Sequence, residues 1–204
     1  MDKTDFKKSL QAYRARKGHF DLVEVPPMNY LMIDGHGDPN TAPAFEEAIA
    51  TLYPLAFKLK FASKQQLDRD YVVPPLEGLW WADDMAAFQD GDKAQWDWTL
   101  MLMTPDWIDR ESVGSAIGQV AAKDPPARLS DVRFETLDEG LCAQTLHIGP
   151  FDDEGPVLRE LHDQFIPGQG LTPTGRHHEI YLSDFRRTPP ERLRTILRQP
   201  VAAH

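Results

Sequence analysis

The sequence has one cysteine, Cys142, no long apolar run and no excess of basic residues. A lone cysteine excludes an internal disulfide, and the charged opening stretch lacks the apolar core of a secretion signal, so we expect a cytoplasmic protein. No apolar run approaches the roughly 20 residues that cross a bilayer, which argues against a membrane partner. The formal net charge of −10 repels phosphate backbones, so nucleic acid is not an expected partner either.

The basic residues include one conspicuous cluster late in the sequence. With 41% hydrophobic and 26% charged residues among 204, the chain can bury a core, and a solvated helix end with salt bridges explains this cluster better than phosphate binding. The cluster consists of Arg186, Arg187, Arg192, Arg194 and Arg198.

The spacing of apolar residues predicts a mixture of strands and helices. Alternation between turn residues predicts strands at 20–25, 28–34, 71–81, 95–103, 132–137, 141–148 and 175–187. Three- and four-residue spacing predicts helices at 45–59, 105–123, 153–165 and 189–199. We expect Pro54 to kink or split the first helix, and the fifth and sixth strands to form a hairpin.

The two halves of the chain repeat one pattern. Each half is predicted to contain a strand, a turn, a strand, a glycine-containing loop, a helix and a strand, with the first repeat at about 19–103 and the second at about 105–187. Such a duplication predicts a single α+β domain over residues 1–204, in which two repeats are related by a pseudo-twofold axis. We expect a ligand cleft between the repeats and a C-terminal helix at about 189–199.

The stretch GRHHEIYLSDFRR contains the best candidate for a reactive site. Strand alternation points His177, Glu179 and Tyr181 to one side. Ile180 and Leu182 point to the other side, where we expect helices to pack. If the first row lines the cleft, Glu179 can act as a general acid or base, and Tyr181 can orient a water or donate to a developing anion. The alternative is a solvent-facing glutamate beside a half-buried packing tyrosine.

Aromatic residues are concentrated near the middle of the chain. They are Tyr71, Trp80, Trp81, Phe88, Trp96 and Trp98. A tryptophan-rich core and the wall of an aromatic pocket are both open interpretations. Adjacent Trp80 and Trp81 cannot face the same side of a regular strand, so one of them can serve each purpose. Glu77, shortly before this pair, is a weaker acid candidate.

The sequence lacks the spacing of the common metal and nucleophile motifs. No HExxH or CxxC is present, and of the consecutive His177, His178 and Glu179 only the first and third share a face. The GSAIG at 114–118 misses the GxSxG pattern by one position. We therefore expect no metal, no other cofactor and no nucleophilic triad.

Three stretches, PLEGLWWADD, WDWTLMLMTPDWI and HHEIYLSDFRRTPPERLRTILRQPV, resemble the GyrI-like small-molecule-binding domain superfamily. The resemblance runs from about Phe20 to Val201. Within this superfamily, the three stretches look like the stand-alone group that is implicated in hydrolysing the cyclopropane of DNA-alkylating spirocyclopropyl compounds. The resemblance implies a fold of two βαββ-type repeats.

The resemblance also implies roles for the candidate residues. Glu179 and Tyr181 would activate a water, and the tryptophans would clamp a hydrophobic aromatic ligand. The tryptophans of this clamp are Trp80, Trp81 and Trp98. We predict further ligand contacts at Tyr71, Phe88, Glu77 and His177. The implied function is detoxification by water addition, and the alternative is sequestration of aromatic or cationic drugs without chemistry. The oligomeric state stays open, a homodimer included, because no heptad or exposed apolar strip marks an interface.

Overall fold

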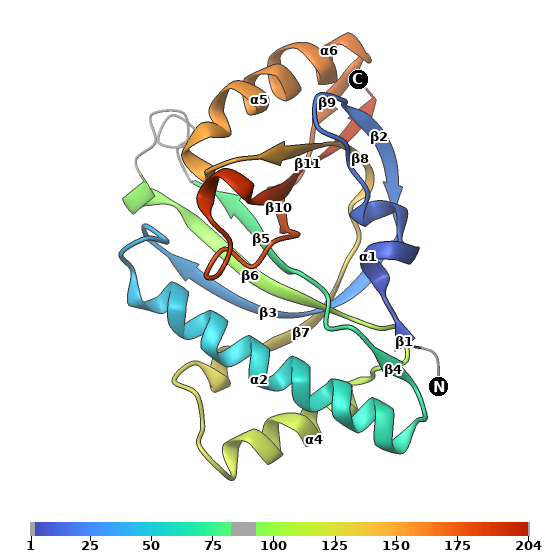
Figure 1. Cartoon of the computed structure of the whole chain (residues 1–204), viewed down its shortest axis with the longest axis vertical. Coiled ribbons are helices and arrows are strands. Elements are labelled where there is room, and N and C mark those ends of the chain that lie inside the picture. The colour runs from blue at the N-terminus through green and yellow to red at the C-terminus, as the bar shows by residue number, and fades with distance from the viewer. Residues whose placement is uncertain (1–2, 83–92, 204) are drawn as a thin grey trace. The chain divides into compact units, whose positions relative to one another are not determined.

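The computed structural model describes residues 3–82 and 93–203 (Figure 1). Its helices and mainly antiparallel strands confirm the α+β class. The chain forms two compact units: unit 1 is Met1–Phe6, Met28–Pro74 and Trp80–Leu137, and unit 2 is Lys7–Pro27, Pro75–Leu79 and Asp138–His204. Each unit therefore takes segments from both predicted repeats.

Unit 1 is built around β3 (Met28–His36), which pairs antiparallel with β6 (Asp97–Thr104) on one side and β7 (Arg133–Leu137) on the other. A separate short pair joins β1 (Lys3–Thr4) to β4 (Asp70–Tyr71) in parallel. Seven of the eight residues of β6 are buried, so the centre of this sheet belongs to the core.

Two helices of unit 1 pack side by side, α2 (Pro43–Gln66) and α4 (Arg110–Ala121), and α2 also packs on β3 and β6 (Figure 1). Pro43 suits the start of α2. The backbone N–H of a first helical residue has no acceptor within the helix, so proline, which lacks this N–H, loses no hydrogen bond there. Pro54 lies inside α2 at an exposed position, and the helix continues through it without splitting.

The helix α4 begins later than the sequence predicts. Thr104 still belongs to β6, where it pairs with Asn29 and donates its hydroxyl to the Asn29 carbonyl at 3.3 Å. The helix starts at Arg110, after Asp109, whose carboxylate accepts the Ser112 backbone N–H at 2.8 Å. Asp109 is therefore the N-cap, and the predicted start at residue 105 is wrong because strand pairing holds Thr104 extended.

Unit 2 contains a second run of antiparallel strands. In hydrogen-bonded order they are β2 (Asp21–Val25), β8 (Gly140–Ile148), β11 (Arg194–Ala203) and β10 (His177–Tyr181), followed by β5 (Leu76–Trp81), with β9 (Leu171–Pro173) paired to the end of β11. Residues 75–79 of the β5 region belong to unit 2, and Trp80 begins the next segment of unit 1.

A helical segment covers one face of the unit 2 strands. It runs through α5 (Gly155–Arg159), a π-helical stretch η5 (Glu160–Phe165) and α6 (Ile166–Gly168). Leu161 and Ile166 from this segment pack with Ala143, Leu171 and Val201 in a buried cluster. The remaining short turns are α1 (Phe6–Ser9), η1 (Gln11–Tyr13), η2 (Lys93–Gln95), η3 (Leu129–Asp131), η4 (Phe151–Asp153) and η6 (Pro190–Arg192).

The predicted helix at 189–199 is wrong, because the chain makes the turn η6 and then enters β11. Ile196 and Leu197 fit a helical spacing, but β11 lies between β8 and β10 and is buried on both faces. A doubly buried strand is a continuous apolar run, which periodicity alone does not separate from a helix. Pro200 lies where the partner of β11 changes from β10 to β9.

The predicted hairpin of 132–137 with 141–148 is also wrong. In the structure β7 pairs with β3, whereas β8 pairs with β11 and β2. Apolar alternation identifies both strands but does not say which strand each will pair with. The predicted strand at 175–187 is shortened to β10, and bends and turns follow Tyr181.

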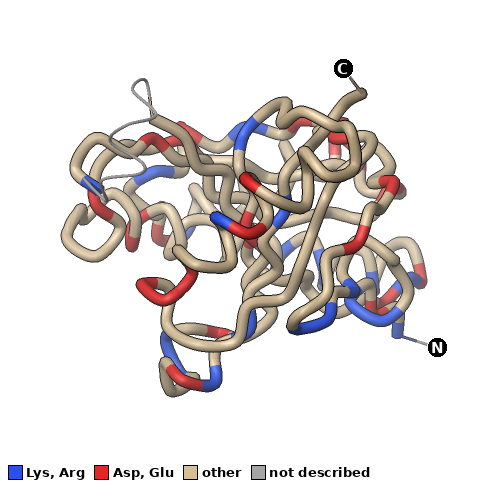
Figure 2. Tube along the Cα trace, turned by 90° about the horizontal axis from the view of Figure 1, so that it is seen from above, with Lys and Arg blue, Asp and Glu red and all other residues tan. Residues whose placement is uncertain are grey.

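Charged residues of both signs are interspersed along the described trace (Figure 2). The predicted basic cluster does not form one solvated helix end: Arg186 pairs with Asp184 at 2.9 Å, while Arg198 is completely buried. Among the described residues, no helix is long and apolar enough to span a membrane.

Candidate functional site

Three polar side chains of unit 2 share one face of β10, as alternation predicts: His177, Glu179 and Tyr181. The Tyr181 hydroxyl donates to Oε2 of Glu179 at 2.8 Å, and Nε2 of His177 lies 3.5 Å from Oε1 of the same carboxylate. The Glu179 side chain keeps 13% of its exposure, so solvent reaches the carboxylate although most of it is covered.

Aromatic rings hold the phenol of this row. Phe151 and Phe185 each meet the Tyr181 ring edge to face, with centroids 5.6 Å away, and their own centroids are 5.9 Å apart. Such T-shaped contacts favour one ring orientation. The Tyr181 hydroxyl is therefore aimed at Glu179 by its packing as well as by its hydrogen bond.

The helical segment of unit 2 covers the Glu179 face of β10. Glu179 pairs with Leu197, and Leu197 pairs with Thr145 on β8. Ala143, two residues from Thr145 and so on the same face, packs against Leu161 of η5. The prediction that Ile180 and Leu182 mark the helix-covered face is wrong for unit 2, because alternation shows which residues share a face but not which face helices will cover.

A second histidine from this segment lies beside the row. The His162 ring in η5 is 6.4 Å from the His177 ring, between centroids. Burial lowers the pKa of His162 to about 4, and His177 lowers it further in the same direction while Asp163 opposes the shift. His162 is therefore neutral at physiological pH.

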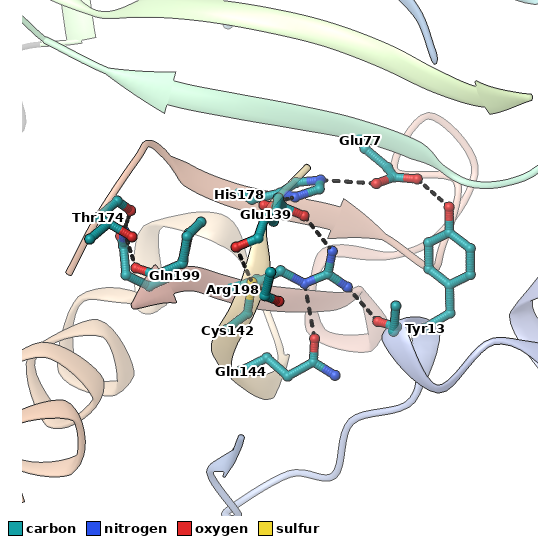
Figure 3. Close-up of polar contacts among 12 residues, drawn as sticks. Tyr13, Glu77, Glu139, Cys142, Gln144, Thr174, His178, Arg198 and Gln199 are labelled. Carbon is teal, nitrogen blue, oxygen red and sulfur yellow. Dashed lines mark hydrogen bonds and ion pairs between the residues drawn. The ribbon is translucent and has the colours of Figure 1, made fainter. Parts of the chain in front are cut away.

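The opposite face of β10 carries a buried network of charges, all from unit 2 (Figure 3). The two ring nitrogens of His178 lie 2.9 Å from Oε2 of Glu77 and 2.9 Å from Oε1 of Glu139. Both neighbours are hydrogen-bond acceptors, so both ring nitrogens carry hydrogen and His178 is an imidazolium. Tyr13 donates its hydroxyl to the other oxygen of Glu77.

Arg198 completes this network. Its guanidinium donates to Oε2 of Glu139 at 2.9 Å, to Oε1 of Gln144 at 3.0 Å and to the Ala12 carbonyl. Gln144 in turn donates to the Arg14 carbonyl at 2.9 Å. Two carboxylates thus face two cations, and the network ties the η1 region to β5, β8, β10 and β11.

Two opposing effects set the pKa values in the network: burial disfavours the charged form of each group, and neighbours of opposite charge favour it. Burial raises the pKa of Glu139, but His178 and Arg198 outweigh it and bring that pKa down to about 2. Burial lowers the pKa of His178, but Glu139 and Glu77 outweigh it and leave that pKa above its ordinary value. Burial, with Glu139 nearby, raises the pKa of the Cys142 thiol to about 12, so this cysteine is an unreactive thiol.

Two predicted ligand contacts therefore have structural partners away from the Glu179 row. Glu77 is completely buried, and its carboxylate contacts Tyr13 and His178. Tyr71, in unit 1, is buried with its ring near Trp107 at 6.1 Å between centroids, and burial raises the pKa of its hydroxyl. Phe88 lies outside the described residues.

Trp98 is buried in the interior of unit 1. Its ring is completely covered and meets Phe45 of α2 edge to face at 5.1 Å, and its indole N–H donates to the Gly37 carbonyl at 3.2 Å. A Cβ at Gly35, its cross-strand neighbour, would lie 2.0 Å from the ring. Glycine is therefore required there to make room for the indole.

The adjacent tryptophans of β5 differ in burial. Trp80 is 5% exposed, with its ring between Phe45 at 6.0 Å and Trp96 at 5.8 Å, whereas Trp81 is only half buried. This agrees with the expectation that neighbours on a strand face opposite ways. The assignment of these rings as a ligand clamp stays a prediction.

Sequence reasoning missed several residues around β10. Phe151 and Phe185 lie in turns and His162 lies within the predicted helix at 153–165, and no periodic pattern shows which side chain each of them contacts. Glu139 falls between the predicted strands at 132–137 and 141–148, and Arg198 falls in the predicted solvated helix end, so neither pattern indicates a buried ion pair. Within the described part of the chain, no group of three or more His, Cys, Asp or Glu side chains is placed to hold a metal ion.

Comparison with known proteins places this geometry among small-molecule-binding folds. Residues 19–202 match the family model of the GyrI-like small molecule binding domain. An uncharacterized conserved protein from Listeria innocua is 40% identical, with a TM-score of 0.89 over 98% of this chain and 100% of its own. A hydrolase from Listeria innocua is 38% identical, with a TM-score of 0.88 over the same shares.

A more distant solved structure shares the fold alone. The C-terminal domain of EcmrR is 13% identical, with a TM-score of 0.55 over 91% of this chain and 98% of its own. No curated protein is similar enough to this chain to count as a match.

Proposed function

Because the chain belongs to the GyrI-like family of small-molecule-binding domains, we propose that it is a hydrolase that adds water to a hydrophobic aromatic electrophile. The observation that carries the proposal is the contact between Glu179 and Tyr181, since it holds a partly solvated carboxylate among aromatic rings. The Listeria innocua hydrolase, similar over almost the whole chain, supports the same reaction class.

The substrate class is a spirocyclopropyl compound conjugated to a carbonyl. The oxygen of water bonds to a cyclopropane carbon, the strained carbon–carbon bond breaks, and its electron pair moves to the carbonyl oxygen, which becomes a phenolate. The water gives up one proton to Glu179, and the phenolate is protonated afterwards. The net change is the gain of one water, which requires no cofactor.

The residues of the row have distinct roles in this reaction. Tyr181 donates to Oε2 of Glu179, and Oε1, which lies 3.5 Å from Nε2 of His177, accepts the proton of the attacking water. The Tyr181 oxygen still has lone pairs, so it can accept a hydrogen bond from that water and orient it. Phe151 and Phe185 offer apolar contact to a flat ligand next to the reacting carbon.

The test is mass spectrometry of a spirocyclopropyl alkylator incubated with the protein. Wild type is expected to yield the ligand plus one water, and Glu179→Gln is expected to lower the rate by about 10²- to 10⁴-fold, because the base is lost while the shape is kept. Tyr181→Phe should cause a smaller loss. The exposed Glu191→Gln is the matched control and should turn over like wild type.

A second candidate function is sequestration without chemistry. A carboxylate beside Tyr181, Phe151 and Phe185 is also a site for a cationic aromatic drug, through ion pairing and cation–π contact. An intact ligand that remains bound to wild-type protein would favour this candidate. Full turnover by Glu179→Gln would refute the assignment of the base.

The proposed physiological role is detoxification. A hydrolysed cyclopropane no longer alkylates DNA, so the reaction would protect the cell that carries the protein. We place this activity in the cytoplasm, where such a compound passes on its way to DNA.

A further inference from the structure

The helix α2 presents an exposed face with a regular spacing. Every third or fourth residue along this face is exposed, in the order Glu47, Ala50, Pro54, Phe57, Phe61 and Lys64. The alternation of three- and four-residue steps is that of the two core positions of a heptad, which lie on the seam of a coiled coil. The face therefore has the spacing of a helix that pairs with another helix, although α2 already packs inward on β3, β6 and α4.

The centre of this face consists of exposed apolar side chains. Phe57 is 46% exposed and Phe61 is 51% exposed, and Tyr53 stacks on Phe57 with centroids 6.4 Å apart. The described residues include only two other large apolar side chains so exposed, Leu22 and Leu67. Phe57 and Phe61 lie one helical turn apart, and neighbouring exposed rings mark interaction surfaces more often than isolated ones do.

An antiparallel copy of α2 complements this face in one register. In antiparallel pairs of helices, the first core position of one heptad meets the second core position of the partner. That rule places Phe61 over the small Ala50 of the partner and Phe57 against its Pro54. At both ends of the same register, Glu47 meets the Lys64 of the partner. One register thus matches large with small side chains and acid with base.

The charges at the two ends of α2 support this pairing. Glu46 and Glu47 are exposed at the N-terminal end. At the other end Asp70 lies 2.6 Å from Lys60 and 3.5 Å from Lys64, so two lysines share one carboxylate and one positive charge is left over. An isologous dimer brings the acidic end of each copy against the basic end of the other.

We propose that the exposed face of α2 is the interface of a homodimer in which two copies pair antiparallel around a twofold axis. The partner is a second copy of this chain, because the face is complementary to itself in both size and charge. The contact of two 24-residue helices is a small interface, so the dimer is expected to dissociate on dilution.

The first test measures molar mass by light scattering or sedimentation across a range of concentrations. The monomer mass is 23.2 kDa, and wild type should approach twice that value as concentration rises. The double variant Phe57→Glu with Phe61→Glu should stay monomeric, because two carboxylates cannot be buried against a copy of themselves. The control Leu22→Glu changes another exposed apolar residue, in unit 2, and should associate like wild type.

The second test uses the charged pair to check the register. Glu47→Lys alone and Lys64→Glu alone should each weaken association by about tenfold, because both ion pairs of the dimer become repulsive. An equal mixture of these two variants should form a heterodimer with wild-type strength, because each lysine at 47 then meets a glutamate at 64 and each lysine at 64 meets a glutamate at 47. Wild type that stays monomeric, a double glutamate variant that still dimerises, or a mixture that does not recover would each overturn the proposal.

Discussion

Unit 1 fills its interior with aromatic rings, such as Trp98 against Phe45, whereas unit 2 buries Glu77, Glu139, His178 and Arg198 side by side. Packed rings depend on close fit with their neighbours, so a change in volume beside them is felt. Buried ions are stable only while each keeps its partner, because an unpaired charge in a low-dielectric interior is costly. The interior of unit 1 should therefore be sensitive to volume, and that of unit 2 to charge.

The largest expected effect comes from breaking the charge network. Arg198→Met keeps most of the side-chain volume but leaves Glu139 without its guanidinium, and we expect the free energy of unfolding to fall by about 3–5 kcal/mol. Urea denaturation followed by far-UV circular dichroism measures the change.

The matched control is the same substitution four residues away on β11. Arg194 is exposed, so Arg194→Met should change the free energy of unfolding by no more than about 0.5 kcal/mol. Equal effects of the two substitutions would show that the network does not stabilise unit 2.

A smaller effect is expected from crowding the rings of unit 1. Gly35→Ala adds only one methyl group, but that carbon would lie 2.0 Å from the Trp98 ring, so the ring or β3 must shift. We expect a loss of about 1–3 kcal/mol in the free energy of unfolding, measured by the same denaturation curve.

A glycine-to-alanine substitution in α4 should raise the free energy of unfolding instead of lowering it. A Cβ at Gly114 meets nothing within 4 Å, and alanine suits a helix interior, so Gly114→Ala should stabilise by about 0.5–1 kcal/mol. If both substitutions were neutral, close packing around Trp98 would not limit the stability of unit 1.

The smallest expected effect is a pH dependence in unit 2. The pKa of His162 is lowered to about 4 in the folded chain, so between pH 6.5 and 4 the unfolded chain binds a proton that the folded chain does not, and stability falls as the pH falls. His162→Gln should remove about 1–2 kcal/mol of that loss at pH 4, less than the full shift implies because the ring is partly solvated.

Thermal denaturation at several pH values between 7 and 4 measures this difference. The control is His19→Gln, which changes an exposed histidine and should follow the wild-type curve. A His162→Gln curve parallel to wild type at every pH would mean that another group causes the acid loss.

The Glu179–Tyr181 pair could be predicted because it depends only on the strand period. Residues two apart on a strand share a face in any fold, so β10 alone brings the carboxylate and the phenol together. The class of fold and the family were predictable for a similar reason, because they depend on local apolar patterns and on three short stretches of sequence. Both predictions were confirmed.

The charge network could not be predicted, because it depends on strand order. Glu77 and His178 are 101 residues apart, and Arg198 reaches Glu139 only because β11 lies beside β8. The exposed apolar face of α2 could not be predicted for another reason. Buried and exposed apolar residues alternate around this helix, so sequence spacing alone does not separate Phe57 from its buried neighbours.

The division of the chain between its units has a consequence for folding during synthesis. The chain passes between the units five times, after Phe6, Pro27, Pro74, Leu79 and Leu137. The strand β11, which lies between β8 and β10, follows every other helix and strand in the sequence. Unit 2 therefore cannot complete its sheet until that strand has left the ribosome, and unit 1 cannot complete its own before β7 emerges. A nascent chain of this protein should thus lack a finished core in unit 2 until β11 has emerged, and its folding should be slow because the essential contacts are long-range.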